Sequence, residues 1–167
     1  MLQPMKRTLA IIAILTPLTA MAEAPSPLGP NKGQFGDWTA ATYGTGLAKI
    51  CYAFTKPQLT TPAVPGRGLA MLTVTERHGS HDEVSITPGF TYPKQAVVSM
   101  ALGKDKIPFY VQDNVAFTDN VNEALEGFAK QDDTIVTSTG PRGKKFTDKF
   151  SLTGFSAAYK AISKACP

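Results

Sequence analysis

Apolar and polar residues alternate along most of the chain after the first 34 residues, in short runs separated by glycine, proline and polar turn residues. Alternation with a period of two places every second side chain on the same face, as in a half-buried β-strand. The run 68–77, for example, puts Leu69 and Met71 on one face and Leu72 and Val74 on the other. The pattern predicts strands over 35–43, 47–55, 68–77, 83–90, 95–103, 106–113, 133–140 and 144–153.

The connections between these strands differ in length. The "GTG" at 44–46 predicts a hairpin between the first two strands, and "LGKDKI" at 102–107 predicts a second, tight hairpin. Residues 55–68 contain three prolines and two glycines, so we expect a long loop there. Long loops inside compact domains are more often functional than short ones, which makes 55–68 a candidate binding surface. An inert surface loop is the alternative interpretation.

Two segments follow the helical period instead, 119–131 and the C-terminal segment from Gly154. In each, apolar side chains recur every three or four residues and form one stripe. Eight strands and two short helices predict a mainly β protein, an antiparallel β-sandwich with one helix at the C-terminus. The stripes consist of Val121, Leu125 and Phe128 in the first helix, and of Phe155, Tyr159, Ile162 and Cys166 in the second.

The N-terminus has the three parts of a secretory signal peptide. Lys6 and Arg7 precede the largely apolar run Leu9–Leu18, and small residues follow at Ala20 and Ala22. The run is shorter than the roughly 20 residues that span a bilayer, so we expect no integral membrane anchor. Cleavage after Ala22 predicts a periplasmic or secreted protein. The predicted organisation is a signal peptide over 1–22, a flexible leader over 23–34 and one domain over 35–167.

The charge of the mature chain is small. Removing 22 residues from 167 leaves 145 residues, and losing Lys6 and Arg7 lowers the formal net charge from +4 to +2. This excess is too small to indicate a nucleic-acid partner. The basic cluster "PRGKK" at 141–145 is interpreted as a solvated turn.

Export determines how the two cysteines are interpreted. Cysteines in an oxidising compartment usually pair, so Cys51 and Cys166 are predicted to form a disulfide. The bridge would close a loop of about 115 residues and fix the terminal helix. Two separately buried, reduced cysteines are the alternative. The spacing does not indicate a metal or redox motif.

The polar stretch "ERHGSHDE" at 76–83 is the main candidate for chemistry. His78 and His81 have a spacing that can place two imidazoles near one metal ion, and a neighbouring carboxylate could be a third ligand. The stretch connects two predicted strands and contains Gly79 and Ser80, which favours a solvated turn. No nucleophile elbow or phosphate loop occurs, and the adjacent Asp132 and Asp133 are interpreted as turn residues. We therefore predict a protein that is not an enzyme and has no cofactor.

The segment "FGDW" opens the first predicted strand with the only tryptophan of the chain. We interpret Phe35, Gly36, Asp37 and Trp38 as a structural signature, with Trp38 buried in the core and Asp37 capping a local turn.

The sequence also resembles the invasion-associated locus B family of small exported alphaproteobacterial proteins. The resemblance rests on "FGDW" and on "KICYAFTKP" (49–57), "DEVSITPGF" (82–90), "TSTGPRGKKFTDKFSLTGF" (137–155) and "AISKACP", in this order. It implies an immunoglobulin-like β-sandwich, a non-enzymatic protein, and a match of Cys51 and Cys166 to family cysteines. The chain departs from the family because no cysteine follows the tryptophan in "WTAATYGTG".

These observations leave three functional hypotheses. The first is a protein that binds an envelope or host protein, with a role in host interaction or virulence that the family name suggests. The second is a periplasmic metal-binding protein that uses His78 and His81. The third is a structural stabiliser of the envelope with no specific ligand.

Overall fold

Residues 24–167 form short strands, three helices and two 3-10 turns, η1 (Gly46–Ala48) and η2 (Pro141–Gly143). The computed structural model describes residues 24–167, and the predicted signal peptide over 1–22 lies outside the described residues. The strands are β1 (Ser26–Pro27), β2 (Gln34–Phe35), β3 (Trp38–Tyr43), β4 (Ile50–Thr55), β5 (Pro57–Thr61), β6 (Met71–Arg77), β7 (Ser80–Thr87), β8 (Val98–Leu102), β9 (Asp105–Gln112), β10 (Val115–Phe117), β11 (Asp133–Thr139) and β12 (Lys145–Ser151). The helices are α1 (Pro30–Gly33), α2 (Val121–Lys130) and α3 (Phe155–Ala165).

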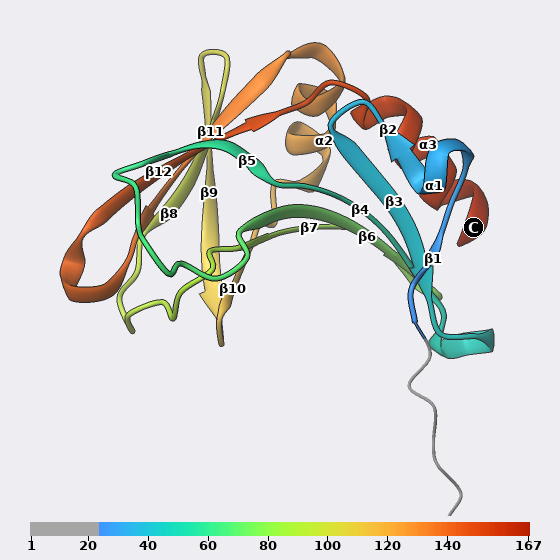
Figure 1. Cartoon of the computed structure of the whole chain (residues 1–167), viewed down its shortest axis with the longest axis horizontal. Helices are drawn as coiled ribbons and strands as arrows, with labels where there is room; N and C mark the ends of the chain where they lie inside the picture. Colours follow the sequence, from blue (N-terminus) through green and yellow to red (C-terminus); the bar gives the residue numbers. More distant parts are fainter. Residues whose placement is uncertain (1–23) are drawn as a thin grey trace, which may run out of the picture.

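The strands of this described part of the chain belong to one antiparallel sheet that curls into half a barrel (Figure 1). The order across the sheet is β1-β3-β4-β6-β7-β10-β9-β8-β11-β12-β5, and β2 pairs with β3 beside this path. The predicted mainly β, antiparallel fold with a C-terminal helix is confirmed. The predicted immunoglobulin-like sandwich of two stacked sheets is not confirmed, because the sheet is continuous.

Two features join the parts of the sheet, the pairing of β9 with two neighbours and the short chain segment from β4 to β5. The first half of β9 pairs with β8, whereas its last residues pair with β10, so β9 joins the two halves of the sheet. Strand β4 leads through Lys56 directly into β5, which pairs with β12 at the far end of the strand order. Figure 1 shows β5 continuing from β4 across the top of the curved sheet. One short chain segment therefore connects the third strand of the order to the last.

The concave face of the sheet carries the core. Residues that face one another across neighbouring strands are buried together, as the alternation of each strand requires. Helices α2 and α3 pack into this face, and their aromatic rings meet Trp38 of β3. The ring centroids of Trp38 lie 5.0 Å from Phe155 and 6.2 Å from Phe128. Cross-strand pairs of the core are Ala40–Ala53, Ala53–Val74, Val74–Val84, Leu72–Ile86, Ile86–Ala116, Val98–Phe109, Met100–Ile107 and Met100–Val136.

The start of the described chain lies against the sheet. Strand β1 pairs with the outer edge of β3, and the backbone N–H of Leu28 donates to the carbonyl oxygen of Ala40 at 2.9 Å. The segment 23–34, predicted as a flexible leader, thus supplies β1 and the short α1 from its described residues. None of the helices within residues 24–167 is long and apolar enough to cross a membrane.

The disulfide between Cys51 and Cys166 is confirmed. It joins β4 to the end of α3, with the two Cα atoms 6.0 Å apart and 115 positions apart in the sequence. Cys51 is fully buried and Cys166 nearly so, on the face of α3 that also buries Phe155 and Ile162. Lys49 adds a second link, because its Nζ donates to the carbonyl oxygen of Ala165 at 2.8 Å.

We predict that replacing the disulfide cysteines by Cys51→Ser/Cys166→Ser lowers the free energy of unfolding by up to about 4–5 kcal/mol, because the unfolded chain gains the entropy of the opened loop. Denaturant unfolding measures this loss. Hydrogen exchange should show increased opening mainly in the last turn of α3, since Phe155 and Ile162 keep the rest of the helix packed. Two reactive thiols in unfolded, unreduced wild-type protein would contradict the bridge.

Candidate binding surface

The segment between β4 and β6 is only partly a loop. The sequence predicts a loop over 55–68, but Pro57–Thr61 forms β5 and pairs with β12. Proline lacks a backbone donor and is tolerated at the first residue of an edge strand, which is where Pro57 lies. The free loop therefore begins after Thr61 and ends where β6 starts at Met71. A deletion within Pro57–Gly66 would therefore not test the loop alone, because it would also remove strand β5, which pairs with β12.

A buried ion pair fixes this loop to the sheet. Asp148 of β12 points into the concave face with 2 % of its side chain exposed, and the guanidinium of Arg67 binds both of its oxygens at 2.7 Å. Thr60 of β5 also donates its hydroxyl to Asp148, at 2.7 Å. Bidentate, charge-assisted bonds of this kind hold a guanidinium in a single orientation. The loop between Thr61 and Ala70 is thus anchored at its centre.

Further contacts complete the anchor of Arg67. Its Nε donates to the carbonyl oxygen of Pro88 at 2.6 Å, and its guanidinium carbon lies 5.0 Å from the ring centroid of Phe90. The chain at Gly68 runs so close to Gly89 that a Cβ on Gly89 would lie 2.3 Å from the carbonyl oxygen of Gly68. Gly89 has φ of +73°, so a side chain there would be strained as well as blocked.

Tyr92 lies behind this anchor with its ring almost fully buried. Among the described residues its hydroxyl has no hydrogen-bond partner. Burial, followed by the negative charge of Asp148, raises the pKa of Tyr92 well above its ordinary value. The hydroxyl therefore stays neutral over the physiological pH range and adds no charge beside the ion pair.

An apolar hollow of about 320 Å³ lies between this loop and the turn that joins β11 to β12. Phe90 and Phe146 form its floor, and their ring centroids are 5.0 Å apart. Exposed Arg142 and Lys144, from the "PRGKK" cluster, form the rim. Figure 1 shows the loop after β5 and the β11–β12 turn on the same side of the molecule. The remaining wall is made by Ala63, Val64, Pro65 and Pro141.

The "FGDW" segment divides into structural residues and one pocket residue. Trp38 is fully buried, and its Nε1 donates to the carbonyl oxygen of Ser151 at 3.1 Å. Gly36 adopts φ of +57° in the two-residue turn between β2 and β3. Asp37 is exposed, and its side chain lines a second hollow that also includes Gln58. The sequence gives no signal for this role of Asp37.

The histidine stretch forms the β6–β7 hairpin, and its buried member is Glu76. Glu76 is 2 % exposed beside the disulfide, opposite Cys51 on the neighbouring strand. Its carboxylate lies 3.0 Å from Nδ1 of His81 and accepts from the hydroxyl of Ser163 at 3.2 Å and from the backbone N–H of Asp82 at 3.2 Å. These bonds connect the hairpin to α3. Sequence alternation could have indicated Glu76, because it falls on the apolar face of β6.

His78 lies apart from this cluster. It is exposed and lines a small hollow with Lys49 and Cys166 at the C-terminal end of the chain. Within residues 24–167, no three His, Cys, Asp or Glu side chains gather closely enough to hold a metal ion.

Tyr159 adds a second bond between α3 and the same hairpin. Its hydroxyl donates to a carboxylate oxygen of Asp82. Burial and this hydrogen bond raise the pKa of Tyr159 to about 12, with further contributions from the charges of Asp82 and Glu76. The neutral phenol is therefore the form that the folded protein stabilises.

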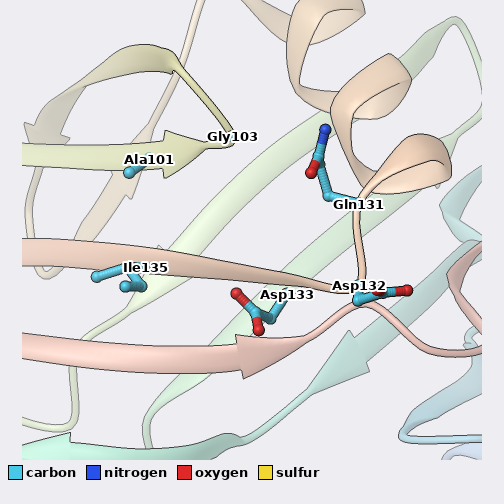
Figure 2. Close-up of a pocket in the computed structure, with 6 residues that line it drawn as sticks. All are labelled: Ala101, Gly103, Gln131, Asp132, Asp133 and Ile135. Carbon is cyan, nitrogen blue, oxygen red and sulfur yellow. The ribbon is translucent and has the colours of Figure 1, made fainter.

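Asp132 and Asp133 do not form a carboxylate pair. Figure 2 shows their side chains pointing away from each other at the edge of a polar hollow of about 290 Å³. Asp133 binds Nζ of Lys149 at 2.7 Å. The hollow also includes Gln131 and Ile135.

No family model matches the chain, and neither a curated protein nor a solved structure is found to be similar to it.

We predict that Arg67→Met destabilises the protein by about 3–5 kcal/mol, because it leaves the Asp148 carboxylate buried without its countercharge. Arg67→Met/Asp148→Asn should cost less than the two single changes added together, which a double-mutant cycle by denaturant unfolding measures. The matched control is the exposed pair Lys130–Glu126, where Lys130→Met should cost less than about 1 kcal/mol. If Arg67→Met and Lys130→Met lowered the free energy of unfolding equally, the result would contradict the role of Arg67 as the anchor of the loop.

We also predict an alkaline effect of Tyr159. Its pKa is raised from 10.0 to about 12 on folding, so its contribution to stability is complete below pH 10 and is lost as the pH rises through 12. Tyr159→Phe should therefore lower stability at neutral pH by about 1 kcal/mol and reduce the steepness of the decline above pH 10. Unfolding experiments at several pH values measure both. Tyr110→Phe, which removes an exposed phenol on β9, is the control.

Proposed function

We propose that this protein is an exported, non-enzymatic binding protein of the invasion-associated locus B family, which captures an envelope or host protein through the apolar hollow between residues 62–66 and 141–144. The observation that carries the proposal is the buried ion pair of Arg67 and Asp148, because the Arg67 guanidinium lies against the rings of Phe90 and Phe146 that line this hollow. Buried charges are expensive, and an inert loop does not need them. A loop held in one conformation loses little entropy when it binds, and this favours recognition.

The lining of the hollow indicates the chemistry of the partner. Phe90 and Phe146 offer a floor for an apolar side chain, while Arg142 and Lys144 place two positive charges at the rim. Nζ of Lys144 lies 5.9 Å from the ring centroid of Phe146, so the cation and the aromatic floor can contact the same ligand. The best complement is a polypeptide segment with an exposed apolar side chain next to carboxylates.

The polar clusters elsewhere support binding rather than catalysis. Glu76 and Asp148 are the buried carboxylates of the concave face, and each is bonded to groups that fix an element of the fold. The disulfide between Cys51 and Cys166 supports an oxidising compartment, as the predicted signal peptide over 1–22 also does. The family resemblance supports an envelope or host partner and a role in host interaction.

We predict that selection of a displayed peptide library on the folded, oxidised protein enriches peptides that combine Asp or Glu with a large apolar residue. Arg142→Glu/Lys144→Glu should lose this enrichment, because the charge at the rim is reversed. The matched control is Lys104→Glu/Lys106→Glu, which reverses two exposed charges at the β8–β9 hairpin. Binding of a selected peptide should also weaken as salt rises.

Two outcomes would contradict this function. Selected peptides that bind both double variants equally would show that the hollow is not the binding surface. Enrichment of basic or uncharged peptides would show that the rim does not set the choice of partner. The same protein preparations should then be used on envelope and host-surface extracts, where the partner must bind the control variant and not the rim variant.

A further inference from the structure

A second hollow, of about 350 Å³, lies on the convex face of the sheet where the β2–β3 turn meets the start of β5. Its volume is at the lower end of the range for small-molecule sites. Its walls come from three places in the sequence, which are the turn, the end of β4 and the first part of β5. Most of the lining is polar, with one aromatic ring. The side chains that matter here are Gln34, Asp37, Thr39, Phe54, Lys56 and Gln58.

The turn that carries Asp37 is held rigidly. The backbone N–H of Asp37 donates to the carbonyl oxygen of Thr153 at 3.0 Å. A Cβ on Gly36 would lie 2.7 Å from that same oxygen, so the turn packs directly on the chain leading into α3. Gly154 approaches the carbonyl oxygen of Phe35 even more closely. The Asp37 carboxylate is therefore presented to the hollow from a fixed backbone, although its side chain is exposed.

The polar groups of the hollow bond to one another and can still form further hydrogen bonds with a ligand. The side-chain carbonyl of Gln34 accepts from the Thr39 hydroxyl at 3.3 Å, and its amide nitrogen donates to the carbonyl oxygen of Gly36 at 2.8 Å. Nε2 of Gln58 donates to Asp37 at 3.5 Å, the length of a weak bond. A carboxylate has about four acceptor positions, so Asp37 can accept further hydrogen bonds from a ligand.

Phe54 gives the hollow an apolar wall. The residue is half-buried on the convex face of β4, between Thr39 of β3 and Thr73 of β6 in the cross-strand register. Tyr52 follows on the same face, with ring centroids 6.1 Å apart and planes inclined by 29°. An aromatic face next to hydroxyl, amide and carboxylate groups matches a sugar ring, which has an apolar C–H face and hydroxyl groups around its edge.

The charges of the hollow balance. Asp37 and Lys56 contribute one negative and one positive side chain, and Gln34, Thr39 and Gln58 are neutral. A strongly charged ligand would therefore gain little from this site, whereas a neutral ligand with several hydroxyl groups can satisfy both kinds of hydrogen-bonding group. We propose that this hollow is a binding site for a neutral saccharide, whose ring stacks on Phe54 and whose hydroxyl groups bond to Asp37, Gln34 and Gln58. The proposal does not depend on the peptide-binding function of the other hollow.

The test is a nuclear magnetic resonance titration of the isotope-labelled, oxidised protein with three neutral probes, which are oligomers of glucose, of mannose and of N-acetylglucosamine. At least one probe should shift the side-chain amide signals of Gln34 and Gln58 in a saturable way. The side-chain amide of Gln131, in the hollow of Figure 2, should not move. Which oligomer binds then identifies the source of the saccharide.

Two variants separate the site from the fold. Asp37→Asn keeps the shape of the side chain but removes its charge, and should weaken binding by about tenfold. Phe54→Leu keeps an apolar residue on β4 but removes the ring, and should weaken binding by a similar factor. Asp105→Asn, at the exposed β8–β9 turn, is the control and should bind like the wild type. Arg142→Glu/Lys144→Glu should also bind the saccharide normally, which distinguishes the two hollows.

The proposal is overturned if none of the three probes produces saturable shifts at Gln34 and Gln58 at millimolar concentration. It is equally overturned if Asp37→Asn binds the saccharide as tightly as the wild type. This result can be interpreted even if Phe54→Leu does not fold. Preference for a sulfated or carboxylated oligosaccharide over its neutral counterpart would also contradict it, since the balanced charges of Asp37 and Lys56 predict the opposite.

Discussion

The structure depends on a single constraint, which is that one curved sheet has one concave face and must fill it. In a sandwich, two sheets bury each other's inner faces, but here the same sheet supplies both sides of the core. Helices α2 and α3 fill it at one end, where Trp38, Phe128 and Phe155 meet. At the other end the loop after β5 fills it with Arg67, because Asp148 points into the same face. The long loop is thus part of the core as well as part of the surface.

The C-terminal helix has the same double attachment. Its apolar face packs on β3 and β4, and the disulfide at Cys166, directly after its last residue, fixes its end covalently. Glu76 and Asp82 of the β6–β7 hairpin form hydrogen bonds with Ser163 and Tyr159 of this helix. A buried carboxylate such as Glu76 is tolerated because the Ser163 hydroxyl and the Asp82 backbone N–H donate to it and Nδ1 of His81 lies 3.0 Å away. The histidine stretch that the sequence offers as a metal site serves, through this carboxylate, to position a helix.

The individual strands and helices can be predicted from the sequence, but the long-range pairing that joins the strands into one curved sheet cannot. Alternation in a segment such as 106–113 predicts β9, because Ile107 and Phe109 fall on one face. Nothing in that alternation shows that the first half of β9 pairs with β8 and its end with β10. The two prolines that bound β5 predict a loop, and only the pairing of Thr60 with Asp148, 88 positions later, makes Pro57–Thr61 a strand. Long-range pairing determines these elements, and a single sequence has no signal for it.

The candidate sites also depend on long-range contacts that a single sequence does not predict. Strand β5 and the loop after it contribute to both of them. Proline and glycine content indicates the segment after β4, but the partners of each hollow come from distant residues, such as Asp37 in one and Phe146 in the other. Strand β5 supplies Gln58 to the wall of the proposed saccharide site, and its end begins the loop that lines the apolar hollow. Because Thr60 and Arg67 both bind Asp148, the strand and the loop are held by the same buried carboxylate. The strand lines one hollow and the loop lines the other, so a ligand in either one contacts a segment whose ordering cost was met when the chain folded.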